Sequence, residues 1–426
     1  MNNCKRITHC LLIFTILYSP FLSFSQSDII KHARFIIDTL SSPHMHGRGY
    51  INKGDSIAAD FIYNEYAKLH LVSFGKDFYQ SFPLNVNTFP GKAELHINGT
   101  NLSAGKDFLP GASSCSCTGK KKLILINRKL IDRKDFLPNI QKTNLQNKAL
   151  LIDTTGISKH QVDILLEKIN YPSNNPLLFI SKEKLTHSLS QTQKSRCTFI
   201  ISDKSLPIFP KKIYYRLNTK WIGNYSSQNV IGYIKGVQKP DSFIVFSAHY
   251  DHLGQIGKEI YFPGANDNAS GCAMLLSLAE YYSVLPPKYS IIFIAFGGEE
   301  LGLLGSNYCI DNQLFKISNI KFMINLDIAG TGDEGIKVVN ATEHPQEFEK
   351  LVKLNSNKKL LPFVLPRGKA ANSDHYHFSQ AGVKTFFIYT LGGIKAYHDV
   401  YDKPETLPLT KFKELFELLI DFTDSL

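Results

Sequence analysis

Four continuous apolar runs in the C-terminal half constrain the fold more than any other feature of this sequence. They read FIVFSA (243–248), IIFIAF (291–296), FMINL (322–326) and TFFIY (385–389). Runs that are continuous rather than alternating are typical of strands buried on both faces, as in parallel sheets. Helix-like stretches such as 270–283 separate the runs. This part of the chain is therefore predicted to be α/β, with a mostly parallel central sheet flanked by helices.

The first 25 residues have the pattern of a targeting segment. Lys5 and Arg6 precede an apolar run from Leu11 to Phe24, and a small residue, Ser25, stands before the predicted cleavage point. This pattern is typical of a signal peptide, and the run is too short to span a bilayer comfortably. No later segment is long enough for a stable membrane span, so we expect an exported protein, periplasmic or secreted.

Residues 86–225 differ in character from the segments on either side. Short β-rich runs such as LILIN (123–127) and ALLID (149–153) alternate there with polar stretches, and almost none of the candidate catalytic residues lie among them. We expect an inserted α/β subdomain over 86–225, beside a catalytic domain built from 26–85 and 226–426.

The charge balance is basic, which can favour acidic surfaces or nucleic acid. Loss of Lys5 and Arg6 with the signal peptide would reduce the net charge from +11 to +9. The lysines are scattered, however, and the one tight cluster, 120–122, directly precedes a strand-like run. We interpret this cluster as a solvated strand edge and expect no nucleic-acid partner. Five cysteines remain after residue 25, which allows one disulfide but no disulfide framework.

Each apolar run leads to side chains that can bind a metal. Because sites in open α/β sheets form at the carboxyl ends of the strands, these side chains should converge on one edge. They are His249, Asp267, Glu299, Glu300, Asp327 and His398.

The adjacent pair Glu299–Glu300 also calls for a cation, since buried neighbouring carboxylates repel each other. A structural ion-pair cluster is the alternative, but no Lys or Arg lies within the nearby motifs. Imidazole and carboxylate ligands suit Zn²⁺, and also Mn²⁺ or Co²⁺. One glutamate could then bind metal while its neighbour takes a proton from metal-activated water.

These motifs resemble the secreted di-zinc exopeptidases of peptidase clan MH. That family includes leucine-type aminopeptidases, glutamate carboxypeptidases and glutaminyl cyclases. The matching words, in family order, are SAHYDH, PGANDNASG, FIAFGGEELGLLGS, NLDIAG, SDHYHF and YHDVYDKPETL, with LSSPHMHGRG as a weaker N-terminal match. The resemblance covers about 26–85 and 226–426. The segment 86–225 resembles a protease-associated domain, with GKDFLP and NKALLID in support.

The resemblance implies two Zn²⁺ per chain, with a general base beside them. One zinc would be bound by His249, Asp267 and Asp327, and the other by Asp267, Glu300 and His398, with Asp267 bridging. Glu299 occupies the position of the general base.

The resemblance also implies three supporting features. Asp251 would orient His249, and Tyr397 would donate to the oxyanion of the tetrahedral intermediate. The peptide bond between Asp267 and Asn268 would be cis.

Other candidate residues are given structural roles. His44 and His46 are interpreted as loop or packing residues, and His375 and His377, which exceed the five-ligand pattern, as residues that line the pocket or contact the ligands. The glycine-rich GTGDEG (330–335) is interpreted as a flexible loop at the rim of the site.

The sequence thus predicts an exported metallo-exopeptidase, most simply an aminopeptidase acting on peptides. A carboxypeptidase on the same fold would need a cation to grip a free carboxylate, for which Arg367 is an isolated candidate. A glutaminyl cyclase would use one zinc, whereas the five-ligand set is intact. A catalytically inactive binding protein would be expected to have lost ligands or the base. The oligomeric state stays open.

Overall fold

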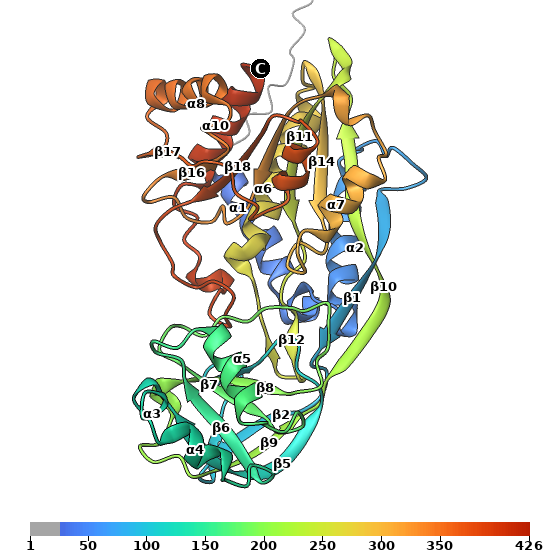
Figure 1. Cartoon of the computed structure of the whole chain (residues 1–426). Coiled ribbons are helices and arrows are strands. Elements are labelled where there is room, and N and C mark those ends of the chain that lie inside the picture. Colours follow the sequence, from blue (N-terminus) through green and yellow to red (C-terminus); the bar gives the residue numbers. More distant parts are fainter. Residues whose placement is uncertain (1–25) are drawn as a thin grey trace, which may run out of the picture.

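Two eight-stranded sheets organise residues 26–426, which are the residues that the computed structural model describes (Figure 1). The predicted signal peptide, 1–25, lies outside the described residues. Within 26–426, no helix is long and apolar enough to cross a membrane.

The first sheet has a parallel centre and antiparallel flanks. In spatial order its strands are β1 (Tyr79–Thr88), β10 (Lys220–Ile234), β14 (Tyr289–Phe296), β11 (Lys239–His249), β15 (Ile320–Leu326), β18 (Thr385–Thr390), β16 (Ile336–Val339) and β17 (Val364–Pro366). The four apolar runs are β11, β14, β15 and β18, and they pair in parallel with one another. β10 and β16 join this centre in antiparallel orientation. The predicted α/β class is confirmed, and the parallel character belongs to the centre of the sheet.

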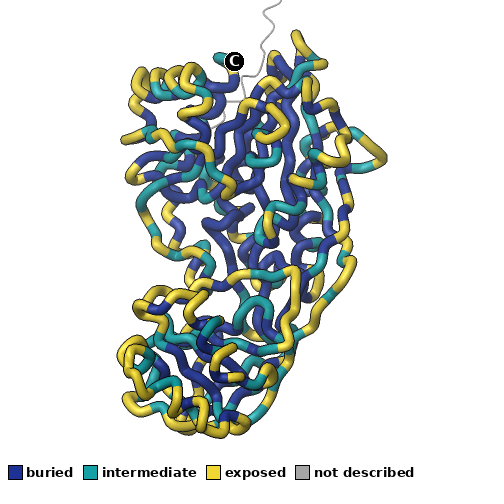
Figure 2. Tube along the Cα trace, in the orientation of Figure 1, coloured by how far each residue is buried: buried dark blue, intermediate teal, exposed yellow. Residues whose placement is uncertain are grey.

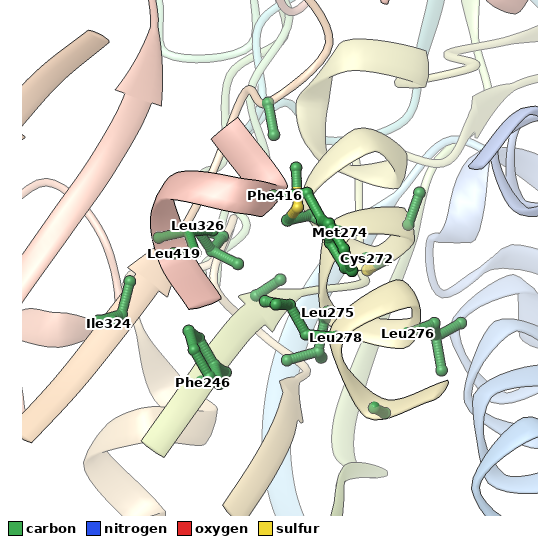
Figure 3. Close-up of a cluster of buried hydrophobic side chains, with 14 of the residues drawn as sticks. Phe246, Cys272, Met274, Leu275, Leu276, Leu278, Ile324, Leu326, Phe416 and Leu419 are labelled. Carbon is green, nitrogen blue, oxygen red and sulfur yellow. The ribbon is translucent and has the colours of Figure 1, made fainter. Parts of the chain in front are cut away.

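Helices cover both faces of this sheet. One face packs on α1 (Gln26–Leu40), α2 (Gly54–Lys68), α6 (Ser270–Val284), α8 (Pro345–Lys358) and α10 (Phe412–Asp424), and the other on α7 (Leu304–Asp311) and α9 (His375–Gln380). Figure 3 shows the apolar side chains of α6 lying between strand and helix, with Met274 and Leu275 between Phe246 and Phe416. This packing fixes α6, whose first turn follows the segment that carries Asp267.

The second sheet forms a separate lobe at the bottom of Figure 1. Its strands, in spatial order, are β3 (Thr100–Leu102), β2 (Ala93–Ile97), β9 (Lys212–Leu217), β5 (Cys117–Ile126), β6 (Lys148–Asp153), β7 (Leu177–Ser181), β8 (Thr198–Ser202) and β4 (Phe108–Pro110). Its helices are α3 (Arg128–Ile131), α4 (Phe136–Gln141) and α5 (Lys159–Lys168). Among the described residues, no strand of this sheet pairs with the first sheet. Residues 86–88 and 220–225, which the sequence assigned to the insertion, lie instead in β1 and β10 of the first sheet.

The two lobes share an apolar contact. Leu253, Ile256 and Phe262, from the loop after β11 that also carries β12 (Gln255–Ile256) and β13 (Ile260–Tyr261), join the cluster that covers one face of the second sheet. Figure 2 shows a buried interior in each lobe, with exposed chain mainly at the periphery. The contact matters for function because the loop after β11 lies between the second lobe and the site described below.

Two sequence interpretations of the second lobe can be compared with the structure. The lysines at 120–122 lie within β5, whose pairing with β6 begins only at Lys122, so Lys120 and Lys121 stand at a strand edge on that side, as the sequence indicated. Lys120 and Lys122 are exposed, and all three lysines line a groove of about 890 Å³. The one disulfide that the composition allowed joins Cys117 to Cys197.

Candidate metal centre

The predicted ligands meet at the carboxyl ends of the parallel strands. His249 is the last residue of β11, and Asp327 directly follows β15. The Nε2 atom of His249 lies 3.4 Å from Oδ1 of Asp267 and 3.5 Å from Oδ1 of Asp327. These three side chains, which come from well-separated parts of the chain, therefore face one another.

A second group shares Asp267 with the first. The Nε2 atom of His398 lies 3.1 Å from Oδ2 of Asp267 and 3.2 Å from Oε2 of Glu300. Asp267 thus presents one carboxylate oxygen to each histidine. This is the arrangement expected of a bridging carboxylate between two cation positions.

The carboxylate and imidazole groups gathered at this site suit a divalent metal ion. The site gathers the carboxylates of Asp267, Glu299, Glu300 and Asp327, and among the described residues none of them forms an ion pair with a Lys or Arg side chain. Within residues 26–426, Oδ1 of Asp327 is buried without a hydrogen-bond partner. Buried carboxylates that lack a cation are costly. Histidine nitrogen with carboxylate oxygen is a ligand set that zinc accepts.

The electrostatics of the site also call for positive charge. Burial opposes a charged imidazole, yet the Glu300 and Asp267 carboxylates raise the pKa of His398 to about 11. Burial and the Asp267 carboxylate act to raise the pKa of Glu300, but His398 and His252 hold it down to about 2. The imidazole of His398 therefore carries a proton where a metal ion would supply the charge instead.

Glu299 differs from Glu300 in its surroundings. Burial raises the pKa of Glu299 well above its usual range, and nearby carboxylates such as that of Asp374 add to this while His249 opposes it. A carboxylate whose proton affinity is increased is suited to accept a proton. The two adjacent residues are thus distinguished by environment rather than by sequence.

Asp251 has a different contact from the one expected. Its carboxylate oxygen lies 3.8 Å from Nδ1 of His249, beyond hydrogen-bond distance, and that nitrogen instead lies 3.1 Å from the Asp251 main-chain carbonyl. The carboxylate accepts from the N–H groups of Glu299 at 3.1 Å and Glu300 at 3.3 Å, and from the Tyr50 hydroxyl at 3.3 Å. Asp251 therefore anchors the glutamate pair with its side chain and His249 with its backbone.

His252 was not singled out from the sequence, although it stands in the motif SAHYDH. It is fully buried, and its Nδ1 lies 2.7 Å from Oε1 of Glu300, which leaves Oε2 facing His398. Its Nε2 has no hydrogen-bond partner. The signal available was its position three residues after His249, beyond the end of β11.

Arg48 and Asp402, also missed, hold the turn that presents Asp267. The Asp402 carboxylate accepts from the N–H groups of Asn266 and Asp267 at 2.9 Å. The peptide bond from Asp267 to Asn268 is cis, as the resemblance implied. Gly264 begins the turn at φ +56°, where a Cβ would lie 2.2 Å from the Asp267 carbonyl oxygen.

Arg48 is buried, has no acidic partner within residues 26–426, and donates instead to main-chain carbonyl groups. Its acceptors are the carbonyl oxygens of Leu40, Tyr250, Pro263, Gly264 and Asp267, at 2.7–3.0 Å. The guanidinium thus ties the N-terminal helix, the end of β11 and the Asp267 turn together. No sequence pattern marks such a role, because the acceptors are backbone atoms.

Replacing Arg48 by Met should destabilise the fold by about 2–4 kcal/mol, since the buried carbonyl groups lose their donor. Arg34→Met is a suitable control, because Arg34 donates to only two carbonyl groups, those of Pro404 and Leu407. The measurement is the free energy of unfolding in urea. Equal losses in the two variants would contradict the organising role of Arg48.

The remaining sequence candidates lie around the site. Tyr397 stacks on the ring of His398, with ring centroids 4.0 Å apart, and is partly exposed. His375 is fully buried. His46 contacts Gln255 at 3.1 Å. Arg367 is exposed and donates to the Tyr389 hydroxyl at 3.1 Å.

Comparison with known proteins agrees with this geometry. Residues 229–423, which contain every predicted ligand, match peptidase family M28. Aminopeptidase YwaD of Bacillus subtilis (strain 168) is 29% identical over 300 residues, covering 67% of this chain and 62% of that protein. A probable zinc metalloprotease of Pyricularia oryzae is 38% identical over 113 residues, covering 26% of this chain and 22% of that protein. The chain therefore spans less than two thirds of the length of these relatives.

Solved structures share the whole fold. The zinc aminopeptidase BSAP from Bacillus subtilis superposes with a TM-score of 0.68 at 22% identity, covering 92% of this chain and 93% of that one. An aminopeptidase from Aneurinibacillus sp. strain AM-1 gives a TM-score of 0.64 at 20% identity, with 92% of each chain covered. Residues 229–423, which carry the site, thus match peptidase family M28, and the fold of the chain matches that of these solved aminopeptidases.

Proposed function

We propose that this protein is a zinc-dependent aminopeptidase that removes N-terminal residues from peptides. The observation that carries the proposal is the shared carboxylate: Asp267 presents one oxygen to His249 and the other to His398, with Glu299 on the neighbouring turn. The family match and the names of the relatives support this reaction class.

We assign two zinc ions to the site. His249, Asp267 and Asp327 would hold one, and Asp267, Glu300 and His398 the other. When bound, zinc polarises a carbonyl group and lowers the pKa of water, as in other zinc hydrolases.

The side chains of the protein would supply the proton transfers and the orientation. Glu299 accepts the proton of the attacking water and then delivers it to the leaving amine. The Asp251 carboxylate accepts hydrogen bonds from the backbone N–H groups of Glu299 and Glu300. It would thereby fix the orientation of these two residues, one as general base and the other as metal ligand. Tyr397, whose ring stacks on that of His398, would donate a hydrogen bond to the developing oxyanion.

A cavity beside Asp267 suggests the substrate side chain. Its volume is about 280 Å³, and its lining is largely apolar, including Ile328, Leu391, Ile394 and Ala396. Such a pocket favours an apolar side chain at the N-terminal residue of the peptide.

Ile394→Trp should fill this pocket. Because the indole would occupy the space of a leucine side chain, kcat/KM for a leucyl-arylamide should fall about tenfold or more, while alanyl-arylamide should be little affected. Parallel kinetics on both substrates measure the effect. An equal loss on both substrates would show that this cavity is not the specificity pocket.

The test of the proposed reaction is a panel of aminoacyl-arylamides and N-blocked peptides, assayed with and without a chelator. Free N-termini should be required and the chelator should abolish turnover. Cleavage of N-blocked peptides from their C-terminus would favour the carboxypeptidase instead. Arg367 gives that alternative little support, because its guanidinium already donates to Tyr389. Failure to turn over any peptide with zinc bound would favour the inactive binding protein, and cyclisation of N-terminal glutamine the cyclase.

We further propose that the second lobe is a protease-associated-like insertion and that the mature protein is exported. The first proposal is supported by the separate sheet between Ala93 and Leu217, and the second by the sequence pattern of residues 1–25. The N-terminal sequence of the secreted or periplasmic protein would test the export.

A further inference from the structure

An irregular segment of the second lobe lies against the metal centre. We call residues 182–193, which connect β7 to β8 and contain no helix or strand, the strap. Two of its side chains are buried. Leu185 joins the apolar cluster of the second sheet, and His187 stacks on Phe262 with centroids 4.8 Å apart and 13° between the ring planes. The strap is therefore anchored at the contact between the two lobes.

The strap contacts His398 through backbone atoms. The His187 N–H donates to the His398 carbonyl oxygen at 2.8 Å, and Nδ1 of His398 lies 3.2 Å from the His187 carbonyl oxygen. A carbonyl oxygen only accepts, so Nδ1 carries a proton and Nε2 is the nitrogen available to a metal. A hydrogen bond at the second nitrogen commonly fixes the tautomer and ring orientation of a metal-binding histidine.

Lys184 of the strap holds the residues on either side of His398. Its Nζ donates to the carbonyl oxygens of Tyr397 at 2.8 Å and Lys395 at 2.9 Å, and pairs with Oδ2 of Asp399 at 2.8 Å. Three contacts from one ammonium group thus span the loop that presents the ligand.

The other end of the strap contacts the loop of the glutamate pair. Nε2 of Gln191 donates to the carbonyl oxygen of Leu301 at 2.9 Å, and Leu301 directly follows Glu300. Leu189 packs against the cluster that contains Leu301. The Trp221 indole N–H donates to the Gln191 carbonyl oxygen at 3.1 Å and so holds this end to β10. One segment therefore contacts the loops of two predicted ligands.

We propose that the strap positions Glu300 and His398 relative to each other, so that the second lobe supports the metal centre without supplying a ligand. Lys184 and Gln191 are its positioning residues. The proposal rests on the proposed zinc site. It also implies linkage: if the strap favours the metal-binding geometry, bound metal must stabilise the strap to the same extent.

Lys184→Met and Gln191→Leu test the proposal through zinc affinity, measured by competition with a chromophoric chelator. Loss of an outer partner of a ligand typically weakens metal binding about 10–100-fold. We expect a loss in this range for Lys184→Met and a smaller one for Gln191→Leu. Lys184→Arg should restore most of the affinity, because a guanidinium can donate to the same acceptors.

Two matched controls lie in the same strap. Lys182 reaches only Asp153, at 3.9 Å, and Gln193 donates to Asn87 and Thr219, away from both ligand loops. Lys182→Met and Gln193→Leu should bind zinc as the wild type does. Wild-type affinity in both test variants, or equal losses in test and control variants, would overturn the proposal.

A second measurement needs no variant and does not depend on turnover. Amide hydrogen exchange at His187 should slow when zinc is added to the metal-free protein, because its N–H donates to His398. Unchanged exchange at 184–191 would overturn the coupling. Wild-type protein that binds zinc, responds at His187 and yet cleaves no peptide would refute the proposed aminopeptidase while leaving the strap intact.

Discussion

Glu299→Gln should retain its metal and bind substrate nearly as the wild type does, while turnover falls by about 10²–10⁴-fold. The substitution preserves the shape of the side chain, but an amide cannot accept the proton of water. The metal ligands are untouched, and the N–H of residue 299 can still donate to Asp251. Metal content and kcat, measured on the same preparation, separate the loss of a base from the loss of a ligand.

Glu300→Gln is the matched comparison for this prediction. Oε2 of Glu300 faces His398 and Oε1 faces His252, so a neutral amide there should weaken metal binding first. Excess zinc should partly restore the activity of Glu300→Gln but not that of Glu299→Gln. If Glu299→Gln loses metal while Glu300→Gln keeps it, the two roles are reversed. If both variants stay fully active, the pair has only a structural role.

Removal of metal should abolish turnover, and zinc should restore it as the second equivalent binds. Both histidines face a carboxylate oxygen of Asp267, so neither cation position is complete without the shared ligand. The measurement is activity across a zinc titration of chelator-treated protein, with metal content determined at each point. In two-metal hydrolytic sites the ions lie about 3.5–4 Å apart, which the shared carboxylate allows.

Magnesium is the control for this titration, because it prefers octahedral oxygen coordination and should restore little. Full activity at one equivalent of zinc would remove the second ion from the mechanism. Such a result would favour a mechanism with a single zinc ion, as expected for a glutaminyl cyclase. Activity that survives the chelator with no metal bound would refute the metallopeptidase altogether.

The sequence by itself determined the centre of the fold and most of the candidate ligands. Continuous apolar runs can only be satisfied by burial on both faces, so β11, β14, β15 and β18 were predictable as a parallel set. Polar residues that end such strands must meet at one edge, so His249 and Asp327 were expected to lie close together, as they do. The motif order then implied the bridging role of Asp267.

The flanking strands β1 and β10 of the first sheet could not be predicted from the sequence in the same way. β1 and β10 carry polar residues on partly exposed faces and pair over a long antiparallel stretch, so neither shows the continuous apolar pattern.

The supports of the site were decided only by tertiary structure. Arg48 acts on backbone carbonyls, Asp251 on backbone N–H groups, and the strap on the backbone of His398, and backbone partners have no residue identity for a sequence pattern to reveal. His187 and His398 are 211 positions apart, so only the packing of the second lobe on the loop after β11 makes them neighbours. The chemistry of a side chain can be inferred from the sequence. The orientation of that side chain depends on contacts between distant segments of the folded chain.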